Sequence, residues 1–245
     1  AGIITVPAGV TSFTVTVPTT ADTIDEANET YTLTVGAASG TGTINDDDAA
    51  PTIQSVTAAT QVEGTALVHT VTLTNASSSS TSFAYTLGGG SATGGGTDYT
   101  TPPTFSNGVT LVAGNLIVPA GVTSFTITVP TTLDTIDEGA SENYNLSVGG
   151  VAATGTITDD DNAPTIASVS SASAVEATSI VHTVTLSNAS SSSTTYTLSL
   201  ADVSATGGGT DYTSTLTSAA FSNGVTLAAG IITVPAGVTS FTVTV

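Results

Sequence analysis

The side chains in this sequence that could do chemistry are carboxylates, and they recur in groups. The 245 residues include 19 Asp and Glu but no Lys or Arg, so the formal net charge is −19. In the middle of the chain the acids fall mostly at turns or strand ends, at Glu63, Asp98, Asp134, Asp137, Glu138, Glu142, Asp159, Asp160 and Asp161. They could form a solvated acidic surface. Two carboxylates about 4 Å apart, however, repel by about 4 kcal/mol at an effective dielectric constant near 20, so several uncompensated pairs would rival the stability of a domain.

A divalent cation would remove this repulsion, and calcium is the cation that the residue types favour. Ca²⁺ accepts about six to eight oxygen ligands in a loose geometry, which suits carboxylates and backbone carbonyls. Mg²⁺ is less suited because it prefers a strict octahedron and keeps its waters. Zinc is disfavoured because the chain has no Cys and only two His. We therefore predict that calcium is the cofactor.

The composition also excludes several classes of function. Without cationic side chains the chain cannot neutralise phosphates or bind an anionic membrane surface, and no apolar run is long enough to span a bilayer. The absence of Cys excludes disulfides and thiolate metal sites. Catalysis is not expected, because there is no Cys or Lys nucleophile and no Asp is placed beside either His. The 39% hydrophobic content argues against a disordered chain.

An internal repeat organises the chain. The segment AGIITVPAGVTSFTVTV at residues 1–17 recurs unchanged at residues 229–245, and a third copy is centred on Phe125. Equivalent landmarks such as Glu63 and Glu176 lie 113 residues apart, which is the size of a domain. Each Asp triplet is followed by an Ala- and Pro-containing linker. These linkers predict the C-terminal part of one repeat at 1–48, a complete repeat at 49–161 and the N-terminal part of another at 162–245.

The elements that must position the acids are predicted to be strands. Apolar residues alternate with Thr, Ser or Asn in runs such as 71–74, 125–129 and 144–148, and Gly-, Asn- and Pro-containing turns separate the runs. Several short strands within about 110 residues indicate an all-β fold of tandem antiparallel Greek-key β-sandwiches. His69 shares a strand face with apolar residues, so we expect a hydrogen-bonded His at the rim of the core rather than a metal ligand.

Six motifs occur in a fixed order across the complete repeat: VEG at 62–64, GTDYT at 96–100, F-x-N-G-V-T at 105–110, DTIDE at 134–138, Glu-x-Tyr at 142–144 and TITDDD at 156–161. In this order they resemble a Calx-β domain. The resemblance implies an immunoglobulin-like sandwich that binds several calcium ions at one end.

The ligands that the resemblance implies are the acids of these motifs. In the complete repeat they are Glu63, Asp98, Asp134, Glu138, Asp159, Asp160 and Asp161. In the partial repeats they are Asp22, Glu26, Asp46, Asp47, Asp48, Glu176 and Asp211. The acidic loop reads DTIDE where the family often has two adjacent Asp, so Asp137 is a further candidate ligand.

The leading functional hypothesis is an extracellular, calcium-stiffened extender of a long bacterial surface adhesin or fibre, secreted or displayed on the cell surface. Its partners would be neighbouring identical repeats and other copies of the chain in a fibre. A second hypothesis is a subunit of a self-assembling filament whose neighbouring chains complete each other's half domains; a covalent continuation of the chain would serve the same purpose. A third is a calcium-sensing or ligand-binding module. The leading hypothesis couples folding to external calcium.

Overall fold

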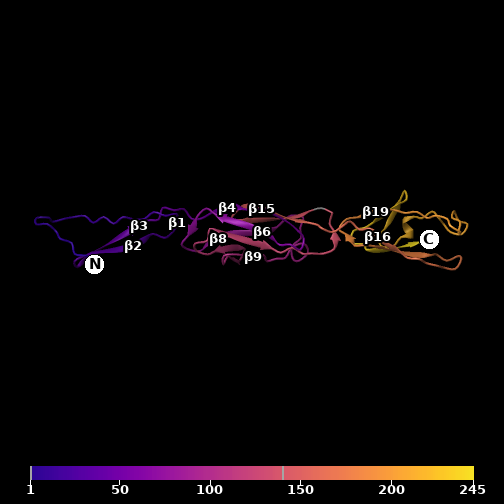
Figure 1. Cartoon of the computed structure of the whole chain (residues 1–245), viewed down its shortest axis with the longest axis horizontal. Coiled ribbons are helices and arrows are strands. Elements are labelled where there is room, and N and C mark those ends of the chain that lie inside the picture. The colour runs from indigo at the N-terminus through magenta and orange to yellow at the C-terminus, as the bar shows by residue number, and fades with distance from the viewer. Residues whose placement is uncertain (1, 140) are drawn as a thin grey trace.

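The computed structural model describes residues 2–139 and 141–245, and it is an elongated row of β structure (Figure 1). With the boundaries that the sequence predicts, we call three consecutive parts of the chain the N-terminal segment (residues 2–48), the central repeat (residues 49–161) and the C-terminal segment (residues 162–245), and they follow one another along its length. The only helical element in the described ranges is one 3₁₀ turn, Ser218–Ala220. The predicted all-β class is confirmed.

The central repeat is a sandwich of two sheets. Its strands are β4 (Ile53–Val56), β5 (Ala59–Val62), β6 (Leu67–Leu73), β8 (Thr81–Gly88), β9 (Thr104–Phe105), β10 (Thr110–Val112), β11 (Asn115–Val118), β12 (Ser124–Val129), β14 (Glu142–Val148) and β15 (Val151–Thr158). One sheet has the order β4-β6-β12-β9 and the other the order β10-β11-β8-β14-β15-β5. All neighbouring strands are antiparallel except β15 and β5, which are parallel.

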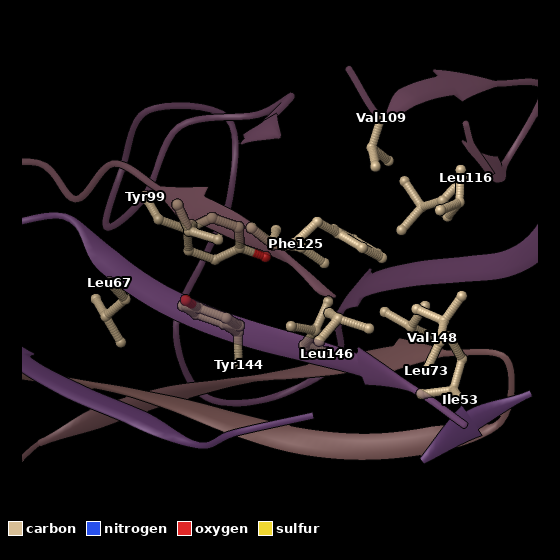
Figure 2. Packing of buried hydrophobic residues seen from close by; sticks show 14 of the residues in the cluster. Ile53, Leu67, Leu73, Tyr99, Val109, Leu116, Phe125, Tyr144, Leu146 and Val148 are labelled. Carbon is tan, nitrogen blue, oxygen red and sulfur yellow. The ribbon is translucent and has the colours of Figure 1, made fainter. Parts of the chain in front are cut away.

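The core lies between these sheets and follows the period-two pattern of the sequence. In β14 the alternate residues Tyr144, Leu146 and Val148 are completely buried, and in β12 Phe125 is 1% exposed. Figure 2 shows Tyr144 and Leu146 directed from their strand toward Tyr99 and Phe125. Burying each such side chain contributes about 1.5–3 kcal/mol, so this apolar layer holds the two sheets together.

One polar pair is enclosed in the core. His69 on β6 is completely buried, deeper than the core rim that its sequence pattern predicts. Its Nδ1 lies 2.7 Å from the carbonyl oxygen of Thr57, and its Nε2 lies 2.9 Å from the hydroxyl of Tyr144. Burial lowers the pKa of His69, which favours the neutral imidazole. Both ring nitrogens are therefore hydrogen-bonded, as expected for a structural His.

Tyr144 fits beneath its neighbouring strand because its cross-strand partner is a glycine. Tyr144 is paired with Gly155 of β15, and a Cβ atom at Gly155 would overlap the Tyr144 ring. The same pairing recurs in the N-terminal segment, where Tyr31 of β2 (Glu29–Val35) faces Gly42 of β3 (Ala38–Ile44). The hairpin β2–β3 is thus the counterpart of β14–β15.

The C-terminal segment forms a smaller sandwich. Its strands are β16 (Ile166–Val169), β17 (Val181–Leu186), β19 (Thr194–Thr197), β20 (Thr226–Ala228), β21 (Ile231–Val234) and β22 (Ser240–Thr244), in two sheets of order β16-β17-β22 and β19-β21-β20. A small cluster that includes Val184, Ile232 and Phe241 fills the space between them. These strands are the counterparts of β4, β6, β8, β10, β11 and β12.

The repeated 17-residue segment has two different conformations. Near the C-terminus it forms β21 and β22, which pair with β19 and β17. The identical residues 2–17 form no strand, and side chains such as Ile3 and Phe13 are exposed; Ala1 lies outside the described residues. Strands β17 and β19 supply the pairing that makes residues 231–234 and 240–244 strands.

Candidate metal centre

The topology brings the acidic motifs of the central repeat to one end of the sandwich. Strands β5 and β15 are parallel, so Glu63 after β5 and the Asp triplet after β15 lie at the same end. Strand β14 is antiparallel to β15, so its first residue, Glu142, starts there. The acidic loop after β12 ends at the start of β14, and the Asp98 loop follows β8. We call this end the acidic pole.

Backbone hydrogen bonds tie the loops of the acidic pole together. The N–H of Glu63 donates to the carbonyl of Thr158, at 3.0 Å. The backbone of Thr132 links two loops. Its N–H donates to the carbonyl of Asp98 at 2.9 Å, and its carbonyl accepts from the N–H of Gly64 at 3.2 Å. Asp98 also accepts, through its carboxylate, a hydrogen bond from the N–H of Thr93. These bonds fix where the carboxylates point.

Glu63, Asp160 and Asp161 form the first carboxylate group of the pole. One carboxylate oxygen from each lies within 4.8 Å of the others. Glu63 is only 5% exposed, and its Oε1 and the Oδ2 of Asp161 are buried without a hydrogen-bond partner. Burial, followed by the charges of Asp134 and Asp161, raises the pKa of Glu63 to about 7. Unpartnered buried carboxylate oxygens are costly, and a cation would satisfy them.

Asp98, Glu138 and Glu142 form the second group. Their nearest carboxylate oxygens also lie within 4.8 Å of one another. Burial, then a hydrogen bond to Asp98 and its charge, raises the pKa of Glu142 to about 7, and burial followed by the charge of Asp134 raises the pKa of Glu138. Both shifts have the same cause, because burial and neighbouring negative charges disfavour the ionised carboxylate.

Three of the candidate ligands lie in the pole but outside these two groups. Asp134 accepts a hydrogen bond from the N–H of Ile136 through its Oδ1, at 2.7 Å. Asp159 holds the acidic loop, because its Oδ2 accepts from the N–H of Glu138 at 3.1 Å and its Oδ1 from that of Asp161 at 3.1 Å. The backbone of Asp137 contacts the C-terminal segment, as described below. Their role as ligands stays a prediction.

Part of this arrangement recurs in the N-terminal segment. An acidic hollow there is lined by carboxylates that include Asp22, Glu26, Asp46, Asp47 and Asp48. Asp46 accepts from the N–H of Glu26 at 3.1 Å, which matches Asp159 and Glu138. Partial burial, then the charge of Asp22, raises the pKa of Glu26; partial burial, then the charge of Asp46, raises that of Asp48.

In the C-terminal segment the candidate ligands are separate. Asp211 accepts from the N–H of Thr206 at 2.7 Å, as Asp98 does from Thr93. Neither Asp211 nor Glu176 joins a group of three acids within the ranges that the structure describes.

The sequence argument left Glu142 out of the ligand set, although its motif was recognised. The signal that identifies it is positional. Glu142 begins β14, two residues before the buried Tyr144, so its side chain starts on the core face at the acidic end.

A comparison with known protein families identifies the type of domain that carries this acidic pole. The Calx-beta domain model matches residues 1–61, 46–155 and 159–237, which is most of the chain. The chain belongs to the Calx-beta family. Calx-beta domains are calcium-associated β-sandwich modules without catalytic activity. No curated protein matches the chain.

The residues of the Calx-beta pole fit calcium. Both carboxylate groups offer only oxygen ligands, which Ca²⁺ prefers. Glu63 and Asp161, both members of the first group, each have a buried oxygen without a hydrogen-bond partner, which a cation could satisfy. Bound there, calcium would neutralise the acids and cross-link the ends of β5 and β15.

None of the helices in the described residues could cross a membrane.

Proposed function

We propose that this chain is an extracellular, calcium-stiffened extender of a bacterial surface adhesin or fibre. The observation that supports the proposal is that both junctions along the chain have the same hydrogen-bonded construction, and that each begins in an acidic loop. Tandem Calx-beta repeats joined in this way would form a long rod, and the candidate calcium ligands lie beside the junctions, where such a rod would otherwise bend.

Each junction is a short parallel β-bridge. At the first junction β1 (Ile24–Asp25) pairs with β7 (Ala76–Ser77), and at the second β13 (Ile136–Asp137) pairs with β18 (Ala189–Ser190). The N–H of Ser78 donates to the carbonyl of Asp25 at 2.9 Å, and that of Ser191 to the carbonyl of Asp137 at 2.8 Å. The acidic loop of one unit thus becomes an edge of the next.

Serine side chains reinforce the two bridges. The hydroxyl of Ser77 donates to Oδ2 of Asp25 at 2.7 Å, and the hydroxyl of Ser190 donates to the carbonyl of Asp137 at 3.0 Å. Both serines are 4% exposed, and Asp137 is 9% exposed. Because both serines are buried, removing either hydroxyl while the junction stays closed would leave its buried acceptor without that hydrogen bond.

A second chain segment crosses each junction beside the bridge. The linker after each Asp triplet is held by an asparagine amide: Asn75 donates to the carbonyl of Ala49 at 2.8 Å, and Asn188 to that of Asn162 at 2.9 Å. Two connected segments resist bending better than one linker does. The sequence Asn-Ala-Ser is the same at both junctions.

The acidic pole and the bridge are continuous. Glu138, a member of the second carboxylate group, directly follows Asp137 of the bridge, and Asp159 anchors the N–H of Glu138. A cation that fixes Glu138 would therefore also fix the loop that forms the bridge. In low calcium the uncompensated acids disfavour this arrangement, whereas the higher calcium outside a cell favours it.

Small-angle X-ray scattering of the 245-residue chain, in millimolar Ca²⁺ and in excess chelator, tests the proposal. We expect a larger maximum dimension and less flexibility in calcium. The double variant Ser77→Ala and Ser190→Ala, which keeps every acid, should lose stiffness in calcium while binding the same number of ions. Equal extension with and without calcium would contradict the proposed function.

A further inference from the structure

We propose that the parallel pair of strands β5 and β15 bears the load when the chain is stretched, and that a divalent cation in the first carboxylate group locks this pair. The inference rests on the proposed extender function, because only a chain under tension needs a load-bearing pair. It goes beyond stiffness at the junctions, since it concerns how the central repeat resists being pulled apart.

The path of tension through the central repeat follows from where the chain enters and leaves it. The chain enters from the first junction at Thr52 and runs through β4 and β5 to Glu63 at the acidic pole. It leaves at the pole, through β15 and the Asp triplet, into the linker of the second junction. Figure 1 shows β4 and β15 lying along the long axis of the molecule. Tension between the junctions therefore acts along the strands.

This tension pulls β5 and β15 in opposite directions along their lengths. Because the two strands are parallel neighbours, β5 is pulled from its start, toward the first junction, and β15 from its end, toward the second. The four residue pairs, from Ala59 with Gly155 to Val62 with Thr158, are then loaded together. Pairs that are loaded together resist a larger force than pairs that open one after another, because no single hydrogen bond carries the whole load.

The junction bridges do not relieve the pair of this load. The bridge between β1 and β7 and the bridge between β13 and β18 have two residue pairs each, half as many as β5 and β15. The covalent chain, by contrast, passes each junction through the linker after an Asp triplet. Once a bridge opens, the linkers transmit the whole tension to β4 and β15.

Two further hydrogen bonds strengthen the pair beside the acidic pole. The N–H of Glu63 donates to the carbonyl of Thr158 at 3.0 Å. The hydroxyl of Thr158 donates to the carbonyl of Gln61 at 3.2 Å. Both bonds connect the end of β5 to the last residue of β15, so sliding the strands apart must break them as well.

The first carboxylate group spans the same two strands. Glu63 directly follows β5, whereas Asp160 and Asp161 follow β15, and one oxygen from each lies within 4.8 Å of the others. Each side of the pair contributes a buried oxygen without a hydrogen-bond partner, Oε1 of Glu63 and Oδ2 of Asp161. Without a cation these acids repel one another at the end of the pair. A bound cation would instead join the two strands and oppose their sliding.

The second carboxylate group does not span this pair. Asp98 lies in the loop after β8, Glu138 in the acidic loop, and Glu142 begins β14. A cation in this group would fix the loop at the junction rather than the ends of β5 and β15. The two groups therefore give the inference an internal control.

Single-molecule force spectroscopy of the 245-residue chain tests the inference through its dependence on pulling direction. The chain has no Cys, so handles can be attached at introduced cysteines at the exposed positions Thr52, Thr65 and Asn162. Pulling Thr52→Cys against Asn162→Cys loads β5 and β15 along their lengths. Pulling Thr65→Cys against Asn162→Cys separates the two strand ends at the pole, so the pairs open one after another. We expect a clearly higher unfolding force in the first direction.

Calcium should slow unfolding when the strands are pulled along their lengths. At one constant force we expect unfolding to be about tenfold or more slower in millimolar Ca²⁺ than in excess chelator, because a site filled at about 100 times its dissociation constant favours the folded state by about a hundredfold. Glu63→Gln should lose most of this difference. Glu142→Gln, the matched change in the second group, should keep it.

A variant that keeps every acid tests the pair without calcium. Thr158→Val removes the hydroxyl that bonds to Gln61, and it should speed unfolding in the first pulling direction in chelator. The matched control Thr154→Val lies on β15 before its pairing with β5 begins, and it should unfold like the unchanged chain.

Equal unfolding forces in the two pulling directions, or Glu63→Gln and Glu142→Gln chains that respond alike to calcium, would overturn the inference. Either result would leave the extender function standing if calcium still extends the chain in X-ray scattering. Slower unfolding in calcium without any gain in extension would have the opposite meaning, because it would support the β5–β15 pair and contradict the extender function.

Discussion

Nε2 of His69 and the hydroxyl of Tyr144 lie 2.9 Å apart and join the two sheets of the central repeat through a polar contact inside an apolar core. The rings meet edge to face, with their centroids 5.8 Å apart. The other ring nitrogen of His69, Nδ1, is hydrogen-bonded to the carbonyl of Thr57. Both polar atoms of the buried imidazole are therefore paired.

Removing the Tyr144 hydroxyl should destabilise the central repeat. Tyr144→Phe leaves Nε2 of His69 buried without a partner, and we expect a loss of about 1–3 kcal/mol in the free energy of unfolding. Chemical denaturation in chelator measures it. Tyr31→Phe, the same change at the exposed counterpart, should alter stability by less than about 0.5 kcal/mol. Equal effects of the two substitutions would show that the core hydrogen bond contributes nothing.

Gly155 should tolerate no side chain. A Cβ there would overlap the buried Tyr144 ring, so Gly155→Ala should cost about 1–3 kcal/mol of stability. Gly42→Ala creates the same overlap with Tyr31, but the exposed Tyr31 ring is free to move away. Thermal unfolding of both variants compares them, and a neutral Gly155→Ala would refute the packing argument.

The calcium-free chain should become less stable as the pH rises through 7. Burial and neighbouring carboxylates raise the pKa of Glu63 and of Glu142 to about 7, from 4.5. Between these values the folded state binds more protons than the unfolded state, so protonation stabilises it and deprotonation destabilises it. His69, whose pKa is lowered by burial, opposes this trend, and its effect is strongest below the ordinary His pKa of about 6.5 and fades above it.

Denaturation in chelator at pH 6.5 and pH 8 measures this dependence. The free energy of unfolding should be lower at pH 8, and the double variant Glu63→Gln and Glu142→Gln should flatten the difference. Equal or greater stability at pH 8 in the unchanged chain would contradict the raised pKa values.

Glu63→Gln should have opposite effects with and without calcium. Without the ion it removes a buried charge that its neighbours repel, so the melting temperature of the central repeat should rise. In calcium it removes a ligand, so the temperature should fall below that of the unchanged chain. Glu176→Gln, the same change at the exposed counterpart, is the matched control. A fall in both conditions would mean that Glu63 is structural only.

The sequence predicted the sandwich because strand alternation follows a local rule, and the resemblance to a Calx-β domain implied that the acids meet at one end. Period-two alternation determines which residues of β6, β12 and β14 face inward. Acidic motifs at strand ends then meet wherever the strands share an end, as Glu63 and Asp161 do. The fixed order of the six motifs indicated the family.

Features that depend on pairing partners were beyond the sequence. The pairing of β22 with β17 and of β21 with β19 joins residues that are 34 positions (Thr197 and Ile231) to 63 positions (Val181 and Thr244) apart, and the alternation within each strand does not specify which partner it takes. Asp137 was proposed as a further ligand because the acidic loop reads DTIDE, and that role stays a prediction; what the sequence did not indicate is that the backbone of Asp137 joins the next segment through Ser190. That contact spans 53 residues of sequence and leaves no periodic signal.

The central claim is that calcium binds the acidic pole, and the melting temperature of the whole chain in millimolar Ca²⁺ and in excess chelator tests it most directly. A site filled at about 100 times its dissociation constant contributes about 2.7 kcal/mol, which for a domain of this size corresponds to a rise of about 5 °C or more. We predict a rise of that size, largely abolished in a chain with Asp159, Asp160 and Asp161 all changed to Asn. A shift of less than about 2 °C would contradict the account.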